Sequence, residues 1–272
     1  AAKDQSGKLY RSFADALNDT SATEITLLKD VTAKPGTTVN TGAFNIDRDL
    51  TIHGNGHTVK ASADWSASAK SHIFNITSGK VAMKGLTIIG NENTKHGVNV
   101  YGKDADVALS DVTIQNCGTA AIVINAGTVT ADGLTTSGNA WGAVNVDNGG
   151  TFTVSDAKLS EDAQIWSEDA SSENGSTITA EGFDAVTVNA DSGNGQADIK
   201  THYTTDKSKL GEAYNESTNT VYDTVERALD AAQTGETVQV QADATLDNGA
   251  DVKDGVSLTV QEGATLTIPD GK

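Results

Sequence analysis

The residues best suited to chemistry in this sequence are asparagine, aspartate and aromatic side chains that recur along its central part. Short apolar runs beginning at Phe74, Val98, Ile122 and Val144 follow one another at intervals of 22 to 24 residues. If the first residue of each run points inward, the residues one and three places later point outward, because side chains alternate along a strand. These outward positions, together with one corner residue, are the predicted ligand-binding residues Asn99, Tyr101, Asn125, Trp141, Asn145, Asp147, Trp166 and Glu168.

A stripe of this composition is suited to binding a sugar. Tryptophan and tyrosine stack on the face of a sugar ring, while amides and carboxylates form paired hydrogen bonds with its hydroxyl groups. Trp141 and Trp166, two of the three tryptophans, fall on the stripe, although aromatic residues make up only 5% of the chain. An ordinary solvated face with a ladder of asparagines explains the pattern equally well, so sugar binding is a hypothesis.

Two Asp-x-Asp pairs, Asp47/Asp49 and Asp104/Asp106, are the candidates for a calcium site. Calcium prefers several carboxylate and carbonyl oxygens, which paired acids at a corner can supply. Solvated turn residues are the simpler interpretation. We therefore predict no cofactor, with calcium as the one ion that these residues could hold.

His72 and His96 are 24 residues apart in matching sequence contexts. This spacing places one histidine above the other in successive turns. A metal would need a third ligand, for which Glu92 is the nearest candidate, and a simple stack of two histidines is the more economical interpretation. We predict no metal site.

A repeat in the sequence predicts the strands that position these residues. Between residues 73 and 159, three sets of short apolar runs recur together with a period of about 22 to 26 residues. One turn of three short strands cannot bury its own apolar side, but stacked turns can, with parallel strands about 4.8 Å apart. The leucine-rich repeat is disfavoured because its Leu-x-x-Leu-x-Leu spacing is absent. The repeat therefore predicts an all-β, single-stranded parallel β-helix with three short strands per turn.

Two short helices interrupt this pattern. Residues 10–17 predict an amphipathic helix with Ser12 as its N-cap, and residues 12–18 are expected to cover the apolar end of the solenoid. The same spacing of apolar residues returns near 222–232 and predicts a second helix. The second copy stops after a few strands, so it is either a short closing unit or, as we favour, the start of a tandem array in a longer surface protein. The expected domains are a capped β-helix over 1–200, a connection over 201–220 and a second short or truncated helix-plus-solenoid unit over 221–272.

Two segments carry a resemblance to known families. Asp49-Leu-Thr-Ile-His-Gly-Asn-Gly-His-Thr-Val59 resembles the opening turn of right-handed parallel β-helices of the pectin-lyase-like kind. Tyr222-Asp-Thr-Val-Glu-Arg-Ala-Leu, with the strand after it, is similar to the helix-then-strand start of repeats in Gram-positive surface proteins. The resemblance implies a right-handed solenoid, but it is weak evidence for an activity, because this fold carries lyases, hydrolases and non-catalytic adhesins.

The catalytic residues that such enzymes use are not recognisable. Pectate-lyase-like chemistry needs an acidic calcium cluster and a strong base, typically arginine or lysine. Of the three arginines, Arg11 and Arg227 lie in predicted helices, which leaves Arg48 alone on the solenoid. A glycosidase needs two carboxylates about 5 to 10 Å apart, a spacing that acids in adjacent turns meet by chance. We predict no catalytic residue and lean towards a protein that is not an enzyme.

Composition narrows the class of partner. The formal net charge is −18, with 19 Lys and Arg against 37 Asp and Glu. Nucleic acid is therefore an unfavourable partner, since phosphate binding needs a basic surface. No apolar run approaches 18 residues, so membrane insertion is not expected. Richness in Thr, Asn, Asp and Gly with a single cysteine is typical of a secreted protein of the bacterial surface.

These observations favour a non-catalytic extracellular module of a bacterial cell surface. We expect it to act as an adhesin, or as a rigid stalk that presents one, with a host or environmental glycan or glycoprotein as its partner. The alternative is a polysaccharide lyase or glycoside hydrolase of the same fold. An ice-binding solenoid is disfavoured, because the outward positions lack regular Thr-x-Thr ladders.

Overall fold

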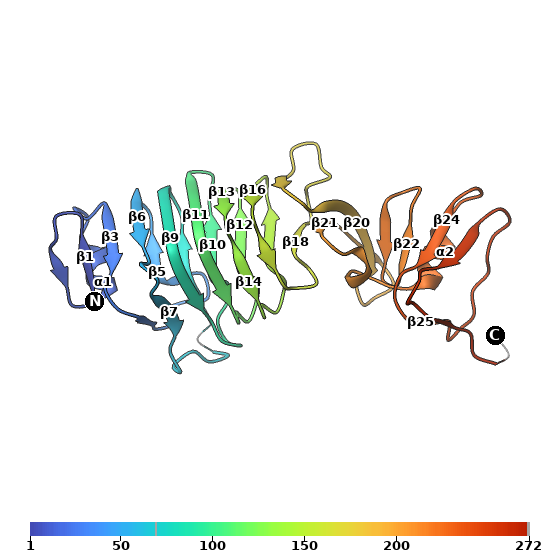
Figure 1. The fold of residues 1–272 in the computed structure, drawn as a ribbon, viewed down its shortest axis with the longest axis horizontal. Helices are drawn as coiled ribbons and strands as arrows, with labels where there is room; N and C mark the ends of the chain where they lie inside the picture. The colour runs from blue at the N-terminus through green and yellow to red at the C-terminus, as the bar shows by residue number, and fades with distance from the viewer. Residues whose placement is uncertain (69, 271–272) are drawn as a thin grey trace. The chain divides into compact units, whose positions relative to one another are not determined.

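A computed structural model describes residues 1–68 and 70–270 of the chain (Figure 1). Contacts divide the protein into two compact units, Ala1–Glu181 and Gly182–Lys272.

The first unit is a parallel β-helix. Its elements are β1 (Ala2–Asp4), β2 (Leu9–Tyr10), α1 (Phe13–Asn18), β3 (Glu24–Leu27), β4 (Val31–Ala33), β5 (Gly42–Ile46), β6 (Leu50–His53), β7 (Thr58–Ala61), β8 (His72–Ile76), β9 (Gly79–Ile89), β10 (Val98–Tyr101), β11 (Ala105–Gln115), β12 (Ile122–Asn125), β13 (Thr128–Asp132), β14 (Thr135–Ser137), β15 (Val144–Asp147), β16 (Thr151–Ser155), β17 (Lys158–Leu159), β18 (Ile165–Ser167) and β19 (Thr177–Ala180).

The register of the parallel ladder is the one that the repeat predicts. Phe74 pairs with Val98, Val98 with Ile122, Ile122 with Val144 and Val144 with Ile165. All five side chains are fully buried. Stacking in the same phase is enforced because a slip by one residue would expose every apolar side chain of a strand. The all-β, parallel β-helical fold is therefore confirmed.

The second and third apolar runs of a turn are joined more closely than expected. In β9 and β11 they form one continuous strand of 11 residues. The strand bends between the two runs at Gly85 and Asp111, which have φ values of +58° and +51°. Only a glycine, or a short polar residue such as aspartate, adopts this left-handed conformation readily. The corner is thus a single residue rather than a loop.

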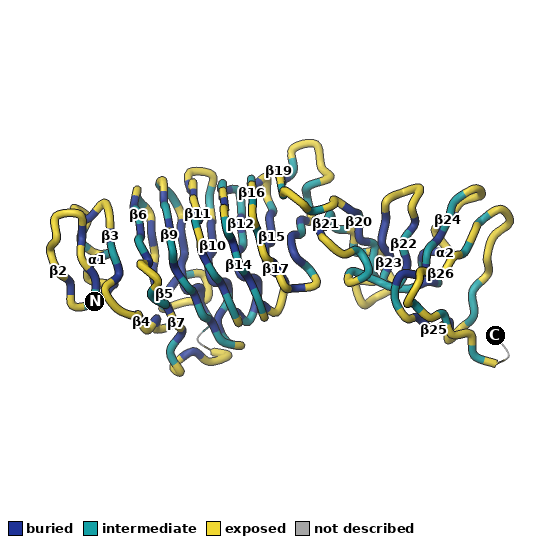
Figure 2. The backbone as a smooth tube through the Cα atoms, in the orientation of Figure 1, coloured by how far each residue is buried: buried dark blue, intermediate teal, exposed yellow. Residues whose placement is uncertain are grey.

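The core of this unit lies between the sheets, and Figure 2 shows buried residues recurring along the strands of successive turns. Phe13, Phe44 and Phe74 meet at one end, with ring centroids 4.8 Å and 5.4 Å apart along the series. Because Phe13 belongs to α1, this aromatic cluster joins the helix to the solenoid. The helix therefore covers the first turns, as expected.

The start of α1 is fixed locally. Ser12 is its N-cap and accepts a hydrogen bond from the Asp15 amide, while the Asp15 carboxylate accepts one from the Ser12 amide. This reciprocal capping box satisfies two amides that a helix start leaves without partners. The predicted N-cap is confirmed.

The end of α1 is held by Arg48. Its guanidinium donates to the carbonyl oxygens of Leu17, Asp19 and Ala22 at 3.1, 3.2 and 2.5 Å. A cation at a helix C-terminus satisfies carbonyls that have no partner within the helix. The only arginine that the sequence places on the solenoid thus anchors the capping helix.

Replacing Arg48 with methionine is expected to lower the free energy of unfolding by about 2 kcal/mol, because charge-assisted hydrogen bonds are worth about 1.5 to 3 kcal/mol. Urea denaturation followed by tryptophan fluorescence measures this loss. Arg11→Met, at an exposed arginine beside the same helix, should change stability by less than about 0.5 kcal/mol. Equal stability of the two variants would contradict the anchoring role.

The second unit combines antiparallel and parallel strands. Its elements are β20 (Asp184–Asp191), β21 (Ala197–Thr204), a 3₁₀ helix η1 (Lys207–Lys209), β22 (Ala213–Asn215), β23 (Thr220–Tyr222), α2 (Val225–Ala231), β24 (Thr237–Val240), β25 (Ala244–Thr245), β26 (Ser257–Val260) and β27 (Leu266–Thr267).

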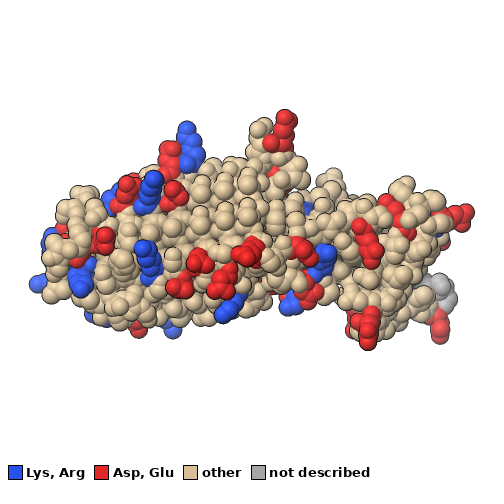
Figure 3. Space-filling view, turned by 45° about the horizontal axis from the view of Figure 1, so that its top comes forward, with Lys and Arg blue, Asp and Glu red and all other residues tan. Residues whose placement is uncertain are grey.

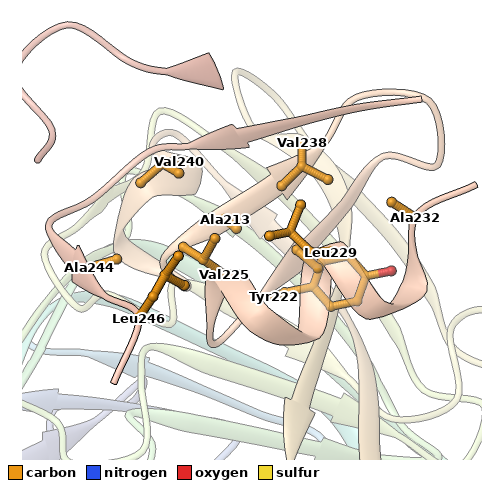
Figure 4. Packing of buried hydrophobic residues seen from close by; sticks show 10 residues of the cluster. Ala213, Tyr222, Val225, Leu229, Ala232, Val238, Val240, Ala244 and Leu246 are labelled. Carbon is orange, nitrogen blue, oxygen red and sulfur yellow. The ribbon is translucent and has the colours of Figure 1, made fainter. Parts of the chain in front are cut away.

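In this unit, as at the start of the chain, a short helix is followed by strands that pair in parallel. β20 and β21 form an antiparallel pair, whereas β24 pairs with β26 and β25 with β27 in parallel. Helix α2, capped by Thr224, packs Val225 and Leu229 into an apolar core with Val238 and Val240 (Figure 4). The helix expected near 222–232 is confirmed.

The segment expected to be a connection is more ordered than the sequence indicates. Residues 201–220 contain the end of β21, η1 and β22, and β22 pairs with both β23 and β24. These strands contain many polar side chains and form no apolar run, so the sequence does not predict them. The expected domain boundaries at residues 200 and 221 remain a prediction.

Candidate binding groove

A groove lies on the outward side of the ladder formed by β8, β10 and β12. Its volume is about 390 Å³, within the range of small-ligand sites. We call it the β8–β12 groove. It is lined by Asn40, His72, Asn75, Thr77, Lys95, His96, Asn99, Tyr101, Val123 and Asn125.

A chain of amides runs along the groove. Asn99 donates through Nδ2 to Oδ1 of Asn75 at 2.8 Å, and Asn75 donates in the same way to Asn45 at 3.2 Å. These residues occupy one register position of β5, β8 and β10. The ladder is interrupted on β12, where Val123 takes this position. The groove thus has an ordered row of amides that ends at an apolar side chain.

Two stacked imidazoles lie beside this row. The rings of His72 and His96 are 4.8 Å apart and 24° from parallel, and Thr119 Oγ1 lies 2.7 Å from His96 Nδ1. Burial lowers the pKa of His72 to about 3, and the nearby charge of Lys95 adds to the shift. Burial also lowers the pKa of His96 well below its ordinary value, with His72 and Lys95 as further causes. Both rings are therefore neutral at physiological pH.

Among the described residues that line the groove, Lys95 has the only charged side chain. It is half-buried at the corner before β10, where its amide donates to the Ser71 carbonyl at 2.8 Å. Burial lowers the pKa of its ammonium group. No aspartate or glutamate that the structure describes lines the groove.

The groove and its ladder lie within a match to a known family. Residues 8–192 match the family model described as "Putative pectate lyase-like adhesive domain". The chain belongs to this family. Comparisons with curated proteins and with solved structures gave no match.

The match identifies the pectin-lyase-like solenoid as one of an adhesive type, in agreement with the predicted resemblance. It spans more than half of the chain and includes all eight residues of the predicted stripe. Within the part of the chain that the structure describes, no helix is long and apolar enough to cross a membrane.

Three of the predicted residues of this adhesive domain line the groove. Asn99 is 7% exposed, held in the amide ladder, whereas Asn125 is partly exposed and Tyr101 is 58% exposed. Tyr101 and Asn125 are paired neighbours on β10 and β12. The structure therefore brings together one exposed aromatic ring and two amides.

The other five predicted residues continue along the next turns and lie outside the groove lining. Trp141 is 55% exposed, and its ring lies 5.9 Å from that of His96. Trp166 donates through Nε1 to the Trp141 carbonyl at 3.2 Å, and Asn145 donates to the Trp166 carbonyl at 3.5 Å. This part of the stripe is linked to the groove through the ring contact of Trp141.

The last two predicted residues follow the same ladder. The carboxylate of Asp147 accepts a hydrogen bond from the Glu168 amide at 2.8 Å. Glu168 is exposed, and Asp147 is partly exposed. They form an acidic end of the stripe.

The sequence did not identify the histidines or Asn40 as lining residues. The recurrence of His72 and His96 was a usable signal, since stacked residues share a face. Asn40 lies in a corner without a period, so no pattern marks it.

The chemistry of other candidate residues is limited. Burial raises the pKa of the Cys117 thiol to about 12, which leaves it neutral and unreactive. Asp49 of one Asp-x-Asp pair accepts a hydrogen bond from the Lys80 amide at 2.8 Å. Among the described residues, no group of three or more His, Cys, Asp or Glu is arranged to hold a metal ion.

Proposed function

We propose that the chain is a non-catalytic adhesive module, exported to a bacterial cell surface, that binds host or environmental glycans or glycoproteins. The observation that carries the proposal is the β8–β12 groove, where exposed Tyr101 stands beside a row of amides. An aromatic ring stacks on a sugar face, and amides donate to and accept from its hydroxyl groups. Trp141, Trp166 and the acidic end of the stripe extend the contact to further sugar units.

The fold supports this role physically. Parallel ladders hold the groove residues of β8, β10 and β12 at a fixed register, so little backbone ordering is needed on binding. Figure 3 shows a broad area without charged side chains on the visible face of the first unit, between groups of acidic and basic residues. Such an area suits neutral ring surfaces.

The composition of the groove favours binding over catalysis. Hydrolysis of a glycosidic bond needs two carboxyl groups that flank it, and the groove lining has none. The two imidazoles are buried and neutral, and they stack on one another. The proposal includes no cofactor, so binding is expected to be unchanged when EDTA removes calcium.

The experiment is binding of the purified chain to an array of neutral and acidic glycans, with turnover of the same polymers assayed in parallel. Binding without turnover supports the proposal. Release of new sugar ends would overturn it in favour of a lyase or hydrolase.

Tyr101→Ala and Trp141→Ala are each expected to weaken binding of a captured glycan about tenfold, equivalent to about 1.4 kcal/mol. The stacked ring contact is lost while the buried ladder is untouched. Isothermal titration calorimetry gives the affinities. Ile199→Ala, at an exposed apolar residue of the second unit, is the matched control and should bind as the unaltered chain does. Full affinity in both aromatic variants would contradict the proposed site.

A further inference from the structure

The charge of the β8–β12 groove is opposite to that of the protein. The chain carries a formal net charge of −18, yet the described residues that line the groove include one lysine and no acid. Among the described residues, no carboxylate lies within ion-pair distance of Lys95, in contrast to Lys8, Lys200 and Lys207. The ammonium group of Lys95 therefore has no carboxylate partner among the described residues, although the chain is rich in aspartate and glutamate.

The position of Lys95 makes this charge available to a ligand. Its side chain is half-buried at the edge of the amide ladder, where the charged form loses part of its hydration. The neutral imidazoles beside it compensate none of that loss. An anion in the groove would offset the lost hydration of the Lys95 ammonium group, because a charge-assisted hydrogen bond is strongest where water is partly excluded.

The size of the groove limits the ligand. A volume of about 390 Å³ suits one or two sugar units rather than a long stretch of polymer. Tyr101 and the amides offer contacts to an uncharged ring, and Lys95 offers a single contact to an anion. The site therefore has one position for negative charge.

We propose that the β8–β12 groove recognises a sugar unit that carries one anionic group, a carboxylate or a sulfate ester, placed against Lys95. The ring of this unit lies along Tyr101 and the amides of Asn99 and Asn125. The inference rests on the proposed glycan-binding function and adds the charge of the ligand to it.

The test uses glycan pairs that differ only in the anion. 3′-Sialyllactose is compared with its methyl ester, and N-acetyllactosamine with its 6-sulfated form. We expect at least one charged member to bind tenfold more tightly than its uncharged counterparts. The carboxylate and sulfate arms separate the two sources of charge.

Variants assign the preference to Lys95. Lys95→Gln should reduce the affinity for the charged member to that of the uncharged one, and Lys95→Arg should retain the preference. Lys158→Gln, which removes an exposed lysine of β17 outside the groove, should leave the preference unchanged. The thermal midpoint of each variant confirms that the ladder is folded.

The outcomes distinguish the two proposals. Equal affinity for charged and uncharged members, with both affinities weakened in Tyr101→Ala, overturns the anionic ligand and leaves glycan binding intact. A preference that survives in Lys95→Gln also overturns the assignment. Absence of binding for every member overturns both.

Discussion

Lowering the pH from 7 to 4 is expected to reduce the free energy of unfolding by about 3 kcal/mol through His72 alone. The pKa of His72 is about 3 in the folded chain, against an ordinary value of 6.5. Between these values the unfolded chain takes up a proton that the folded chain does not. The contribution of neutral His72 to the free energy of unfolding is therefore complete above pH 6.5 and is lost as the pH falls towards 3.

The burial of the pair is the physical cause. His72 is 3% exposed and His96 6% exposed, so neither ring is hydrated when it becomes charged. The ammonium group of Lys95 disfavours a second positive charge nearby. His96 responds in the same direction, which adds to the acid sensitivity of this turn.

The measurement is urea denaturation at pH 7, 5.5 and 4, followed by tryptophan fluorescence. All three tryptophans, Trp65, Trp141 and Trp166, belong to the first unit, so the signal reports on the solenoid. Carboxylates also titrate in this range, and His72→Gln is the control for them. The variant should lose about 3 kcal/mol less than the unaltered chain between pH 7 and 4. Parallel pH profiles would show that His72 does not control the acid response.

Asn139→Leu is expected to lower the free energy of unfolding by about 3 to 5 kcal/mol, the range for breaking a buried charged network. Asn139 Oδ1 accepts from the Cys117 amide at 2.9 Å, and Nδ2 donates to the Ile114 carbonyl at 3.2 Å. The same Nδ2 lies 2.6 Å from the carboxylate of Glu161. Leucine has similar bulk but leaves all three partners without their hydrogen bonds.

The carboxylate is the critical group in this network. Glu161 is 9% exposed, and its other oxygen accepts from Thr136 Oγ1 at 2.6 Å. Three successive turns are joined here, because Asn139 connects the strand that ends near Gln115 with the corner at Glu161. Loss of the Asn139 side-chain amide leaves the buried Glu161 carboxylate with fewer hydrogen-bond donors. The expected loss of stability is therefore electrostatic and does not arise from packing.

Chemical denaturation of three variants checks this prediction. Asn174→Ala, at an exposed asparagine of the same unit, should change stability by less than about 0.5 kcal/mol. Adding Glu161→Gln to Asn139→Leu should recover part of the loss, because the unpaired charge is removed. If the single and double variants are equally unstable, the cost arises from shape and not from the carboxylate.

The two networks explain why an adhesive surface can be built on a narrow solenoid. The two histidine rings stack on one another next to the corner that carries Lys95, and Asn139 and Glu161 form hydrogen bonds next to the corner that carries Trp141. Each corner is therefore fixed by a buried interaction specific to it. The side chains that face outward are presented from a rigid frame.

The sequence by itself determined the ladder. Phe74, Val98, Ile122 and Val144 recur with one period, and parallel strands in the same phase are the arrangement that buries all of them. The N-cap of α1 could also be predicted, because a serine three residues before an acid satisfies the first helical amides locally. Interactions that are local or periodic leave a mark in the sequence.

Only the tertiary structure decided how exposed the outward residues are. Asn99 and Asn145 point outward as their phase requires, yet each is 7% exposed. Strand phase gives the direction of a side chain, whereas its exposure depends on neighbours stacked about 4.8 Å above and below it. The amide ladder therefore covers its own members.

The groove itself was also decided by the tertiary structure. Lys95 and Asn40 close it from corners whose lengths and conformations do not repeat. Bends at Gly85 and Asp111 join runs that appear separate in the sequence. A corner is positioned by contacts between residues distant in the chain, and such contacts have no period. The sequence therefore determined the strands and their phase, and the packing of the corners determined the site.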